Sequence, residues 1–469
     1  MLSVNLASIS LTVWLFLFAI SLIHQAKTRR PWLAVLCLLA GWLTLPVADY
    51  PQPFDRILHS RWGMGQFLFG AELNTRLFQT SLGAWAVAIV HCWRHRPARP
   101  RLGAMDGVAA ALPLASLLSA LAADADLSWI AMQFAYLSVT WLGWWSLGRV
   151  LAVASPPTSR DAHAACVVAG LFLLASVAEF LAGPWLYTAA YGVHPFEDEG
   201  HQRAIFNRPL LAFEDGNQYG LTVAMLAVFA LTFWIGGARP PGASERTRAW
   251  EGIAAWAAGF VALASQSRGA LLLGGGVLAL LGLRRRRWLK VAAAGLAGVT
   301  LLVAAFQFAG ILSADRLINR TEIGRQLKSE LKSAGLGSFG WRVGLGERYF
   351  PLIRQRPLLG YGHANWWQGS EAALRDAPPL SGDRPWPFVI LIAGAYGITG
   401  LIGVMAVLVI PTLRTFVRTR DRPIDRGNRL RIAIALVLGV QIGDLFFNST
   451  LLPASLALAG YLATKNRDA

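Results

Sequence analysis

Three arginines stand at turns between apolar segments of this sequence, where their side chains can act together on an anion. Arg208 precedes Pro209 in the connection formed by residues 194–219, Arg268 lies in a Ser-Arg-Gly, and Arg342 lies in a long polar insert. A guanidinium is planar and donates two parallel hydrogen bonds, which suits it to the oxygens of a diphosphate. We therefore expect Arg208, Arg268 and Arg342 to bind a diphosphate, with Arg356 in support.

The composition indicates which elements must position these side chains. Of the 469 residues, 55% are hydrophobic and only 15% are charged, and the mean hydropathy is +0.46. Such a chain is too apolar for a water-soluble protein and is typical of an all-α, polytopic bundle of transmembrane helices. The net charge of +17 fits basic cytoplasmic loops and does not indicate nucleic-acid binding.

Apolar runs near the length that spans a bilayer predict about twelve or thirteen transmembrane helices. The thirteen candidate segments are residues 5–24, 32–47, 70–92, 103–122, 127–148, 163–182, 217–236, 249–266, 269–283, 288–309, 386–413, 430–447 and 450–464. Residues 1–309 thus hold ten spans with short loops, residues 310–385 form one large loop, and residues 386–469 hold the last spans.

The positive-inside rule gives this bundle an orientation. Alternate connections carry most of the 43 lysines and arginines, so we assign those connections to the cytoplasm. The first helix has no basic segment before it and is expected to be retained, entering from outside. Parity then places the large loop outside, and its basic residues do not contradict this because the rule exempts long loops.

Five ionisable residues within or beside the apolar runs fall toward the outer face: Glu72, Arg76, Glu179, Arg268 and Asp444. Burying such groups is costly unless they pair with one another or line a wet cavity. Their common depth indicates an outward-facing polar chamber. Ion pairs between helices, without a function, are the alternative.

The large loop is expected to be partly helical. Apolar residues recur at four-residue spacing over 316–332, which predicts an amphipathic helix that lies either on the outer leaflet or in solvent. A second helical pattern covers 341–353 and ends before a glycine-rich turn. Asn365 and Trp366 follow that turn, where they can contact sugar, although Trp also anchors membrane interfaces.

The sequence indicates no metal or cofactor site. Residues 194–219 contain two histidines and several acids, but their spacing matches no strong ligand pattern, so a solvated loop is favoured. The three cysteines, Cys37, Cys92 and Cys166, lie within or at the ends of apolar runs. They form neither a disulfide framework nor a metal-binding spacing.

An ordered set of motifs resembles the O-antigen polymerase and O-antigen ligase family. The set consists of Arg208 with residues 213–217 at a helix start, Ser267-Arg268-Gly269-Ala270, Arg342, Arg356-Pro357-Leu358-Leu359-Gly360-Tyr361-Gly362, and Gly397-Ile398-Thr399-Gly400-Leu401. The resemblance covers the C-terminal half to two-thirds of the chain.

This resemblance implies a metal-independent glycosyltransferase without a cofactor, in the inner membrane of a bacterium. The enzyme would move a glycan off an undecaprenyl diphosphate carrier on the periplasmic face, in contact with membrane lipid. A chain-length regulator and export proteins are expected as further partners. The arginines would stabilise the leaving diphosphate, and further substrate contacts are expected from Asn217, Glu214 and Asp215.

The sequence also departs from the family pattern. Trp386-Pro387 stands where a His-Asn pair is usual, and Ala395 stands where an acid is usual. The base that takes the proton of the acceptor hydroxyl would then be His363, or else Glu214 or Asp215. The departure favours a polymerase of exopolysaccharide or O-antigen repeat units over a ligase.

Two further alternatives stay open besides the ligase. A transporter of lipid-linked sugars would show internal repeats and charges at mid-depth, and neither is clear in this sequence. A non-catalytic scaffold of polysaccharide export would tolerate single arginine substitutions.

Reporter fusions test the predicted orientation. Fusions after Arg99, Ser244 and Arg420 are expected to report cytoplasm, because basic connections stay on that side. Fusions near Gln202 and Lys328 are expected to report the outside. A cytoplasmic signal at Lys328 would contradict both the parity and the function that it supports.

Overall fold

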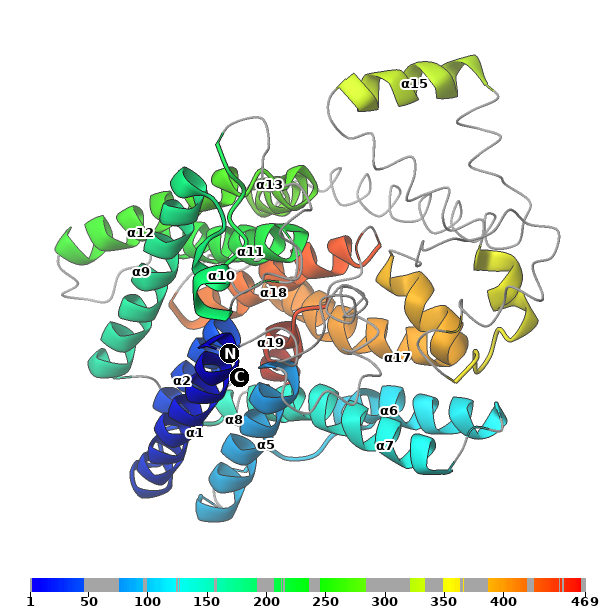
Figure 1. The fold of residues 1–469 in the computed structure, drawn as a ribbon, viewed down its shortest axis with the longest axis horizontal. Helices are drawn as coiled ribbons and strands as arrows, with labels where there is room; N and C mark the ends of the chain where they lie inside the picture. Colours follow the sequence, from blue (N-terminus) through cyan, green and yellow to red (C-terminus); the bar gives the residue numbers. More distant parts are fainter. Residues whose placement is uncertain are drawn as a thin grey trace.

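The apolar runs of the sequence fold as helices, and the fold is all-α (Figure 1). The computed structural model describes residues 2–45, 76–95, 99–123, 125, 127–155, 158–191, 206–211, 213, 216–235, 245–283, 321–333, 349–362, 366, 387–419, 426–446, 448 and 451–464. Twelve of the thirteen predicted apolar segments form helices in this part of the chain. The remaining segment, 288–309, lies outside the described residues.

The described elements follow one another in a simple order. They are α1 Leu2–Thr28, α2 Trp32–Thr44, α5 Arg76–Arg94, α6 Ala104–Ala122, α7 Leu127–Leu137, the π-helical turn η2 Ser138–Leu142, α8 Gly143–Leu151, α9 Ser159–Ala182, α10 Leu186–Tyr191, α11 Gly216–Ile235, α12 Glu245–Ala264, α13 Arg268–Leu283, α15 Glu322–Ser333, α17 Phe388–Thr419, α18 Arg426–Asp444 and α19 Pro453–Ala463. The turn η2 joins α7 to α8, so residues 127–151 run as one continuous helix with a π-helical turn inside it.

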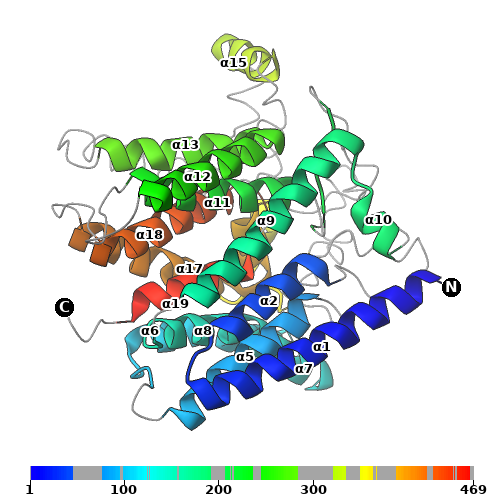
Figure 2. The ribbon, with the colours of Figure 1, turned by 90° about the vertical axis from the view of Figure 1, so that its left-hand side faces the viewer.

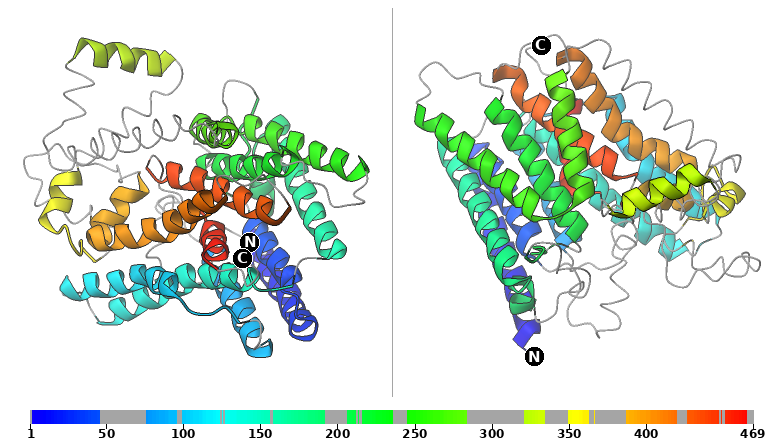
Figure 3. Two further views of the ribbon diagram at one scale, coloured as in Figure 1. Left: turned by 180° about the vertical axis from the view of Figure 1, so that it is seen from behind. Right: turned by 90° about the horizontal axis from the view of Figure 1, so that it is seen from above.

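Five helices of the described chain are long and apolar enough to cross a membrane. They contain the stretches Ile9–Thr28, Ala104–Ala122, Ala164–Ala182, Gly216–Ile235 and Phe388–Thr419. Shorter apolar helices accompany them, among them α2 and α19. The helices pack side by side (Figure 3), and the start of α1 and the end of α19 lie at opposite ends of the bundle (Figure 2).

Three clusters of buried apolar side chains hold the bundle together. The largest surrounds α17 and joins it to α1, α2, α5, α6, α8 and α19. The second joins α9, α11 and α12 through residues such as Phe172, Tyr219 and Val261. The third joins α11 to α18 through Met225 and Val440. Because α11 belongs to two clusters, its first turn is firmly placed.

Helix α17 is broken at Gly397, which has φ 64° and ψ −166°. In an unbroken helix the N–H groups of Ile398 and Thr399 would donate to the carbonyls of Gly394 and Ala395. The break separates these four groups. Each of them would cost several kcal/mol if it were left unpaired inside a bilayer.

The turn formed by residues 357–362 supplies partners for all four separated groups. Ile398 N–H donates to the Pro357 carbonyl at 2.8 Å, and Thr399 N–H donates to the Leu358 carbonyl at 3.4 Å. In the other direction, the N–H groups of Tyr361 and Gly362 donate to the carbonyls of Gly394 and Ala395, both at 2.9 Å. The turn therefore completes the hydrogen bonding of α17.

Side chains from α6 and α7 close over this turn. The Ser119 hydroxyl donates to the Leu359 carbonyl. The amide nitrogen of Gln133 donates to the Gly362 carbonyl at 3.1 Å and to the Tyr396 hydroxyl at 3.0 Å. Residues 357–362 of the large loop are thus built into the bundle.

Two further described segments of the large loop are helical, in agreement with the predicted partly helical loop. Helix α15 covers Glu322–Ser333 where the amphipathic pattern was expected, and it stands away from the bundle in Figure 1. Residues 349–355 are also helical, at the end of the second predicted helix. Whether α15 lies on the leaflet or in solvent stays a prediction, as does the division at residues 309 and 385.

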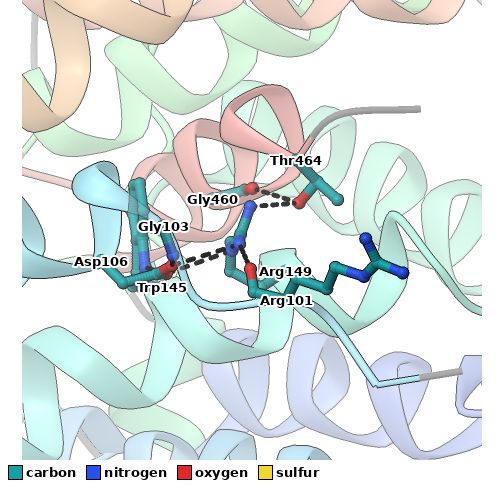
Figure 4. A network of polar contacts seen from close by, with 7 residues as sticks. All are labelled: Arg101, Gly103, Asp106, Trp145, Arg149, Gly460 and Thr464. Carbon is teal, nitrogen blue, oxygen red and sulfur yellow. Dashed lines mark hydrogen bonds and ion pairs between the residues drawn. The ribbon is translucent and has the colours of Figure 1, made fainter. Parts of the chain in front are cut away.

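An ion-pair network ties three helices together at the end that the charge pattern assigns to the cytoplasm (Figure 4). The Arg149 guanidinium lies 3.1 Å from the Asp106 carboxylate, and Trp145 donates to the same carboxylate at 2.9 Å. Arg149 also donates to the Arg101 carbonyl and to the Thr464 hydroxyl at 3.0 Å. The network joins the start of α6, the end of α8 and the residue after α19.

Replacing Gly397 by Ala should destabilise the protein by at least about 3 kcal/mol. The backbone conformation is one that only glycine adopts readily, and a methyl group there would come within 2.2 Å of the Leu358 carbonyl oxygen. Thermal unfolding of the purified protein in detergent measures the effect. The control is Gly276→Ala in α13, where a methyl group meets nothing within 4 Å. Equal unfolding temperatures for the two variants would contradict this account of the break.

Candidate functional site

Arg208 lies at the N-terminus of α11, where its guanidinium is held on two sides. Its Nε donates to the Ser265 carbonyl at 3.1 Å, and its Nη2 donates to the Asn217 side-chain oxygen at 3.3 Å. The side chain is only 3% exposed. A guanidinium held in one plane is suited to bidentate contacts with phosphate oxygens. The N-terminus of α11 adds N–H groups and the positive end of the helix dipole.

The guanidinium reaches this position because residue 216 has no side chain. A methyl group at Gly216 would lie 2.2 Å from the Nε and 2.3 Å from the central carbon of Arg208. The arginine side chain therefore covers the Cα of Gly216 directly. Glycine at the first position of α11 is what allows this close approach.

The corner between α12 and α13 forms the other wall of the site. Gln266 has a positive φ of 51°, which turns the chain sharply, and the Ser265 side chain accepts from the Ser267 N–H at 3.3 Å. Ser267 is buried and packs on α11 so closely that a methyl group at Gly220 would lie 2.2 Å from its Cβ. Arg268 follows as the exposed first residue of α13.

A second buried arginine lies beside this site. The Arg76 guanidinium lies over the Trp42 ring, 4.4 Å from its centroid, and donates to the Gln218 side chain at 3.0 Å. It also lies 5.5 Å from the centroid of Phe213. Arg76 thus ties α5 and α2 to the first turn of α11. This agrees with the expectation that Arg76 and Arg268 lie toward one end of the bundle.

Glu179 has neither of the roles that the sequence suggested for it. Its carboxyl oxygens accept three backbone N–H groups, from Leu186, Leu210 and Leu211, and the residue is fully buried. Within the described chain it therefore lines no wet chamber and forms no ion pair. Periodicity revealed a buried acid here, but only the fold shows that the acid caps backbone groups.

Of the other two acids predicted near the outer face, Asp444 is described by the structure and Glu72 is not. Asp444 is buried at the end of α18 and accepts a hydrogen bond from the Asn448 side chain. The backbone carbonyl of Asn448 accepts from the Phe388 N–H at 3.0 Å, so the end of α18 meets the start of α17. Glu72 lies outside the described residues.

Arg356 and Trp366 belong to a second group of residues, built on the 357–362 turn. Arg356 is exposed and lies over the Tyr361 ring, 5.3 Å from its centroid. Burial raises the pKa of the Tyr361 phenol, and Arg356 partly offsets this, so the phenol stays protonated and donates to the Leu352 carbonyl at 3.0 Å.

Trp366 is packed inside this second group. Its ring stacks on Tyr361 at 5.9 Å between centroids and is 1% exposed. A methyl group at Gly394 would come within 1.9 Å of it, so the indole fills the space beside α17. The predicted contact of Trp366 with sugar stays a prediction.

Several predicted site residues lie outside the described part of the chain. They are Arg342, His363, Asn365, Glu214 and Asp215. The structure thus brings together Arg208, Asn217 and the corner that carries Arg268, and it leaves the position of the base open. Sequence reasoning missed the Ser265 carbonyl and Gln218 as partners of the two buried arginines. Gln218 stands in the first turn of a helix beside Asn217, which was a usable signal, whereas a backbone carbonyl leaves none.

A family model described as O-antigen ligase matches residues 253–405. The resemblance to the O-antigen ligase family is thereby confirmed. The match contains the corner with Arg268, the 357–362 turn and the break in α17. The matched range is shorter than the range covered by the motifs of the resemblance, because Arg208 and Asn217 lie before residue 253. No curated protein matches the chain.

The residues matched by the O-antigen ligase model include two separate groups described above. The corner before α13 places Arg268 at a helix N-terminus, and the 357–362 turn is held by hydrogen bonds to α17 and α7. Arg208 lies outside the match and contacts the corner before α13 through its hydrogen bond to the Ser265 carbonyl.

The variant Gly216→Ala should displace Arg208 without unfolding the protein. Alanine is a better helix former than glycine, so α11 should persist while the methyl group moves the guanidinium. Isothermal titration calorimetry with inorganic pyrophosphate should then show an affinity at least about tenfold lower. A change of this size is expected from the loss of one charge-assisted hydrogen bond. Gly259→Ala in α12, where a methyl group meets nothing within 4 Å, is the control. Unchanged pyrophosphate binding by the Gly216 variant would remove Arg208 from the site.

Proposed function

We propose that the chain is a membrane glycosyltransferase that polymerises undecaprenyl diphosphate-linked repeat units of an exopolysaccharide or O-antigen. The observation that carries this proposal is the pairing of a buried, oriented Arg208 with an exposed Arg268 where α11 meets the start of α13. The reaction takes place on the periplasmic face of the inner membrane. The match to the O-antigen ligase family model supports a lipid-linked glycan as substrate.

The transfer breaks one bond and forms one. The acceptor hydroxyl oxygen attacks the anomeric carbon of the donor glycan, and the bond from that carbon to the phosphate oxygen breaks. Undecaprenyl diphosphate leaves with the electron pair of the broken bond. The proton of the acceptor hydroxyl passes to a base.

The arginines act on the leaving group. Negative charge grows on the diphosphate as the bond breaks, and donors that are already in place stabilise that charge without reorganising. Arg208 is fixed in this way by Ser265 and Asn217. Arg268 supplies a second guanidinium from the surface, and Arg342 and Arg356 are the further cations of the proposal. No metal ion is needed for this step.

The base is assigned to His363, with Glu214 and Asp215 as the alternatives. A base must lie within hydrogen-bond reach of the acceptor hydroxyl. The turn that ends at Gly362 supports His363, because that turn is anchored by hydrogen bonds to α17 and α7. A histidine next to a fixed backbone loses little conformational entropy when it is positioned.

A ligase that transfers the completed glycan to another acceptor is the second candidate. The description of the matching family favours it. The departures at Trp386-Pro387 and Ala395 favour the polymerase. The lipid-linked glycans of a deletion strain separate the two: single repeat units accumulate without a polymerase, and finished polymer accumulates on its lipid carrier without a ligase.

Substitutions at Arg268 test the proposal directly. Arg268→Ala should remove nearly all polymer, and Arg268→Lys should remove most of it, because an ammonium keeps the charge but loses the planar fork. Polymer per cell and protein per membrane are measured together. Arg94→Ala is the control, since Arg94 is an exposed arginine at the opposite end of α5 from Arg76. Normal polymer from a stably inserted Arg268→Ala protein would exclude this role for Arg268.

A further inference from the structure

The loop that carries Arg208 has a strained backbone. Phe206 begins it with φ 54°, and Leu211 ends it with φ 47°. Residues with side chains rarely adopt positive φ, and they persist there only when surrounding contacts hold them. The position of Arg208 therefore depends on whatever anchors residues 206–211.

The last turn of α9 provides that anchor. The Glu179 carboxyl group accepts from the N–H of Leu210 at 2.9 Å and of Leu211 at 2.7 Å through one oxygen. Its other oxygen accepts from the N–H of Leu186 at 3.2 Å. The backbone of the same turn assists, since the Phe180 carbonyl accepts from the Asn207 N–H at 3.1 Å.

These contacts lie on both sides of Arg208 in the chain. Asn207 precedes it and Leu210 follows two residues later, so the backbone of Arg208 is held between two bonds to α9. Irregular backbone buried in a membrane protein must find acceptors within the protein. Glu179 accepts two N–H groups that no helix or sheet ladder satisfies.

We propose that Glu179 is a positioning residue that fixes Arg208 for binding the diphosphate of the lipid carrier. The proposal rests on the function proposed above for Arg208. Glu179 does not itself touch the substrate, because both of its oxygens are engaged by backbone N–H groups. It acts through the loop, and the guanidinium of Arg208 is what meets the ligand.

The first experiment measures the loop without any ligand. In full-length protein with Cys37, Cys92 and Cys166 replaced by Ala, the variant Leu210→Cys reports loop opening through its rate of maleimide labelling, because Leu210 is only 1% exposed in the closed loop. Glu179→Leu removes the acceptors and should raise that rate at least about tenfold, the effect of losing one or two hydrogen bonds. An unchanged rate would overturn the proposal, whatever Arg208 does.

The second experiment measures coupling between Glu179 and Arg208. Undecaprenyl diphosphate is titrated into the full-length protein in nanodiscs. Arg208→Ala and Glu179→Leu should each raise its Kd about tenfold or more, and the double variant should bind no more weakly than Arg208→Ala alone. Such non-additivity is expected when one residue acts through another. A double variant whose losses multiply would overturn the proposal, because Glu179 would then act separately from Arg208.

Glu179→Gln covers the case in which Glu179→Leu does not fold. An amide has the size of the carboxyl group but offers one oxygen and one NH2, so it keeps only some of the three contacts. A Kd raised a few fold is expected, and this change should disappear in the Arg208→Ala background. A Kd left unchanged by Glu179→Gln in the otherwise unaltered protein would overturn the proposal.

Gln441→Leu is the matched control for a general loss of stability. The Gln441 side-chain oxygen accepts from the Leu452 N–H at 3.1 Å and the Ser455 hydroxyl at 3.0 Å, so it anchors a different loop in the same manner. It should lower the unfolding temperature and leave the Kd unchanged. If Arg208→Ala leaves the Kd unchanged while Glu179→Leu still speeds labelling, the fault lies in the proposed function and not in the anchoring.

Discussion

Backbone groups inside a bilayer must find partners within the protein, because lipid offers none, and the break in α17 brings this constraint to the centre of the bundle. Two N–H groups and two carbonyls that a straight helix would pair are satisfied instead by the turn at residues 357–362. Helices α6 and α7 pack around that joint with polar side chains. The large loop is consequently anchored at residues 357–362. The packing of α6, α7 and α17 depends on this contact between the turn and the break in α17.

The same constraint shapes the site around Arg208. The strained loop at residues 206–211 is irregular backbone, and its N–H groups are satisfied by a buried acid and a helix carbonyl of α9. The guanidinium in turn is oriented by a carbonyl of the α12–α13 corner. Both regions therefore combine an irregular segment with neighbouring helices that pair its backbone groups. Such segments can present side chains at defined positions without a mobile loop.

The sequence predicted the parts of the fold that depend on local pattern. Long apolar runs are sufficient to predict the helices, and their alternation correctly places Arg76 and the corner that carries Arg268 near the same end of α11. The break at Gly397 could not be predicted, because α17 reads as one apolar run and the turn that occupies the break begins forty residues earlier. Glu179 was recognised as a buried acid, but its partners are backbone N–H groups, which have no sequence signature. For the candidate site, residue chemistry suggested Arg208 and Asn217, whose side chains form a hydrogen bond in the fold, and the fold added the carbonyl that orients the arginine.

The docking of the 357–362 turn in the break of α17 also has a consequence for how the chain enters the membrane. Residues 357–362 precede α17 and, in the proposed orientation, must be translocated across the bilayer before α17 is inserted. A newly inserted α17 can pair Ile398 and Thr399 with Gly394 and Ala395 as a straight helix, and this form satisfies the bilayer by itself. Docking of the turn then exchanges those two bonds for four. Insertion and maturation are thus separate events, and the second requires that the translocated loop fold back onto the bundle.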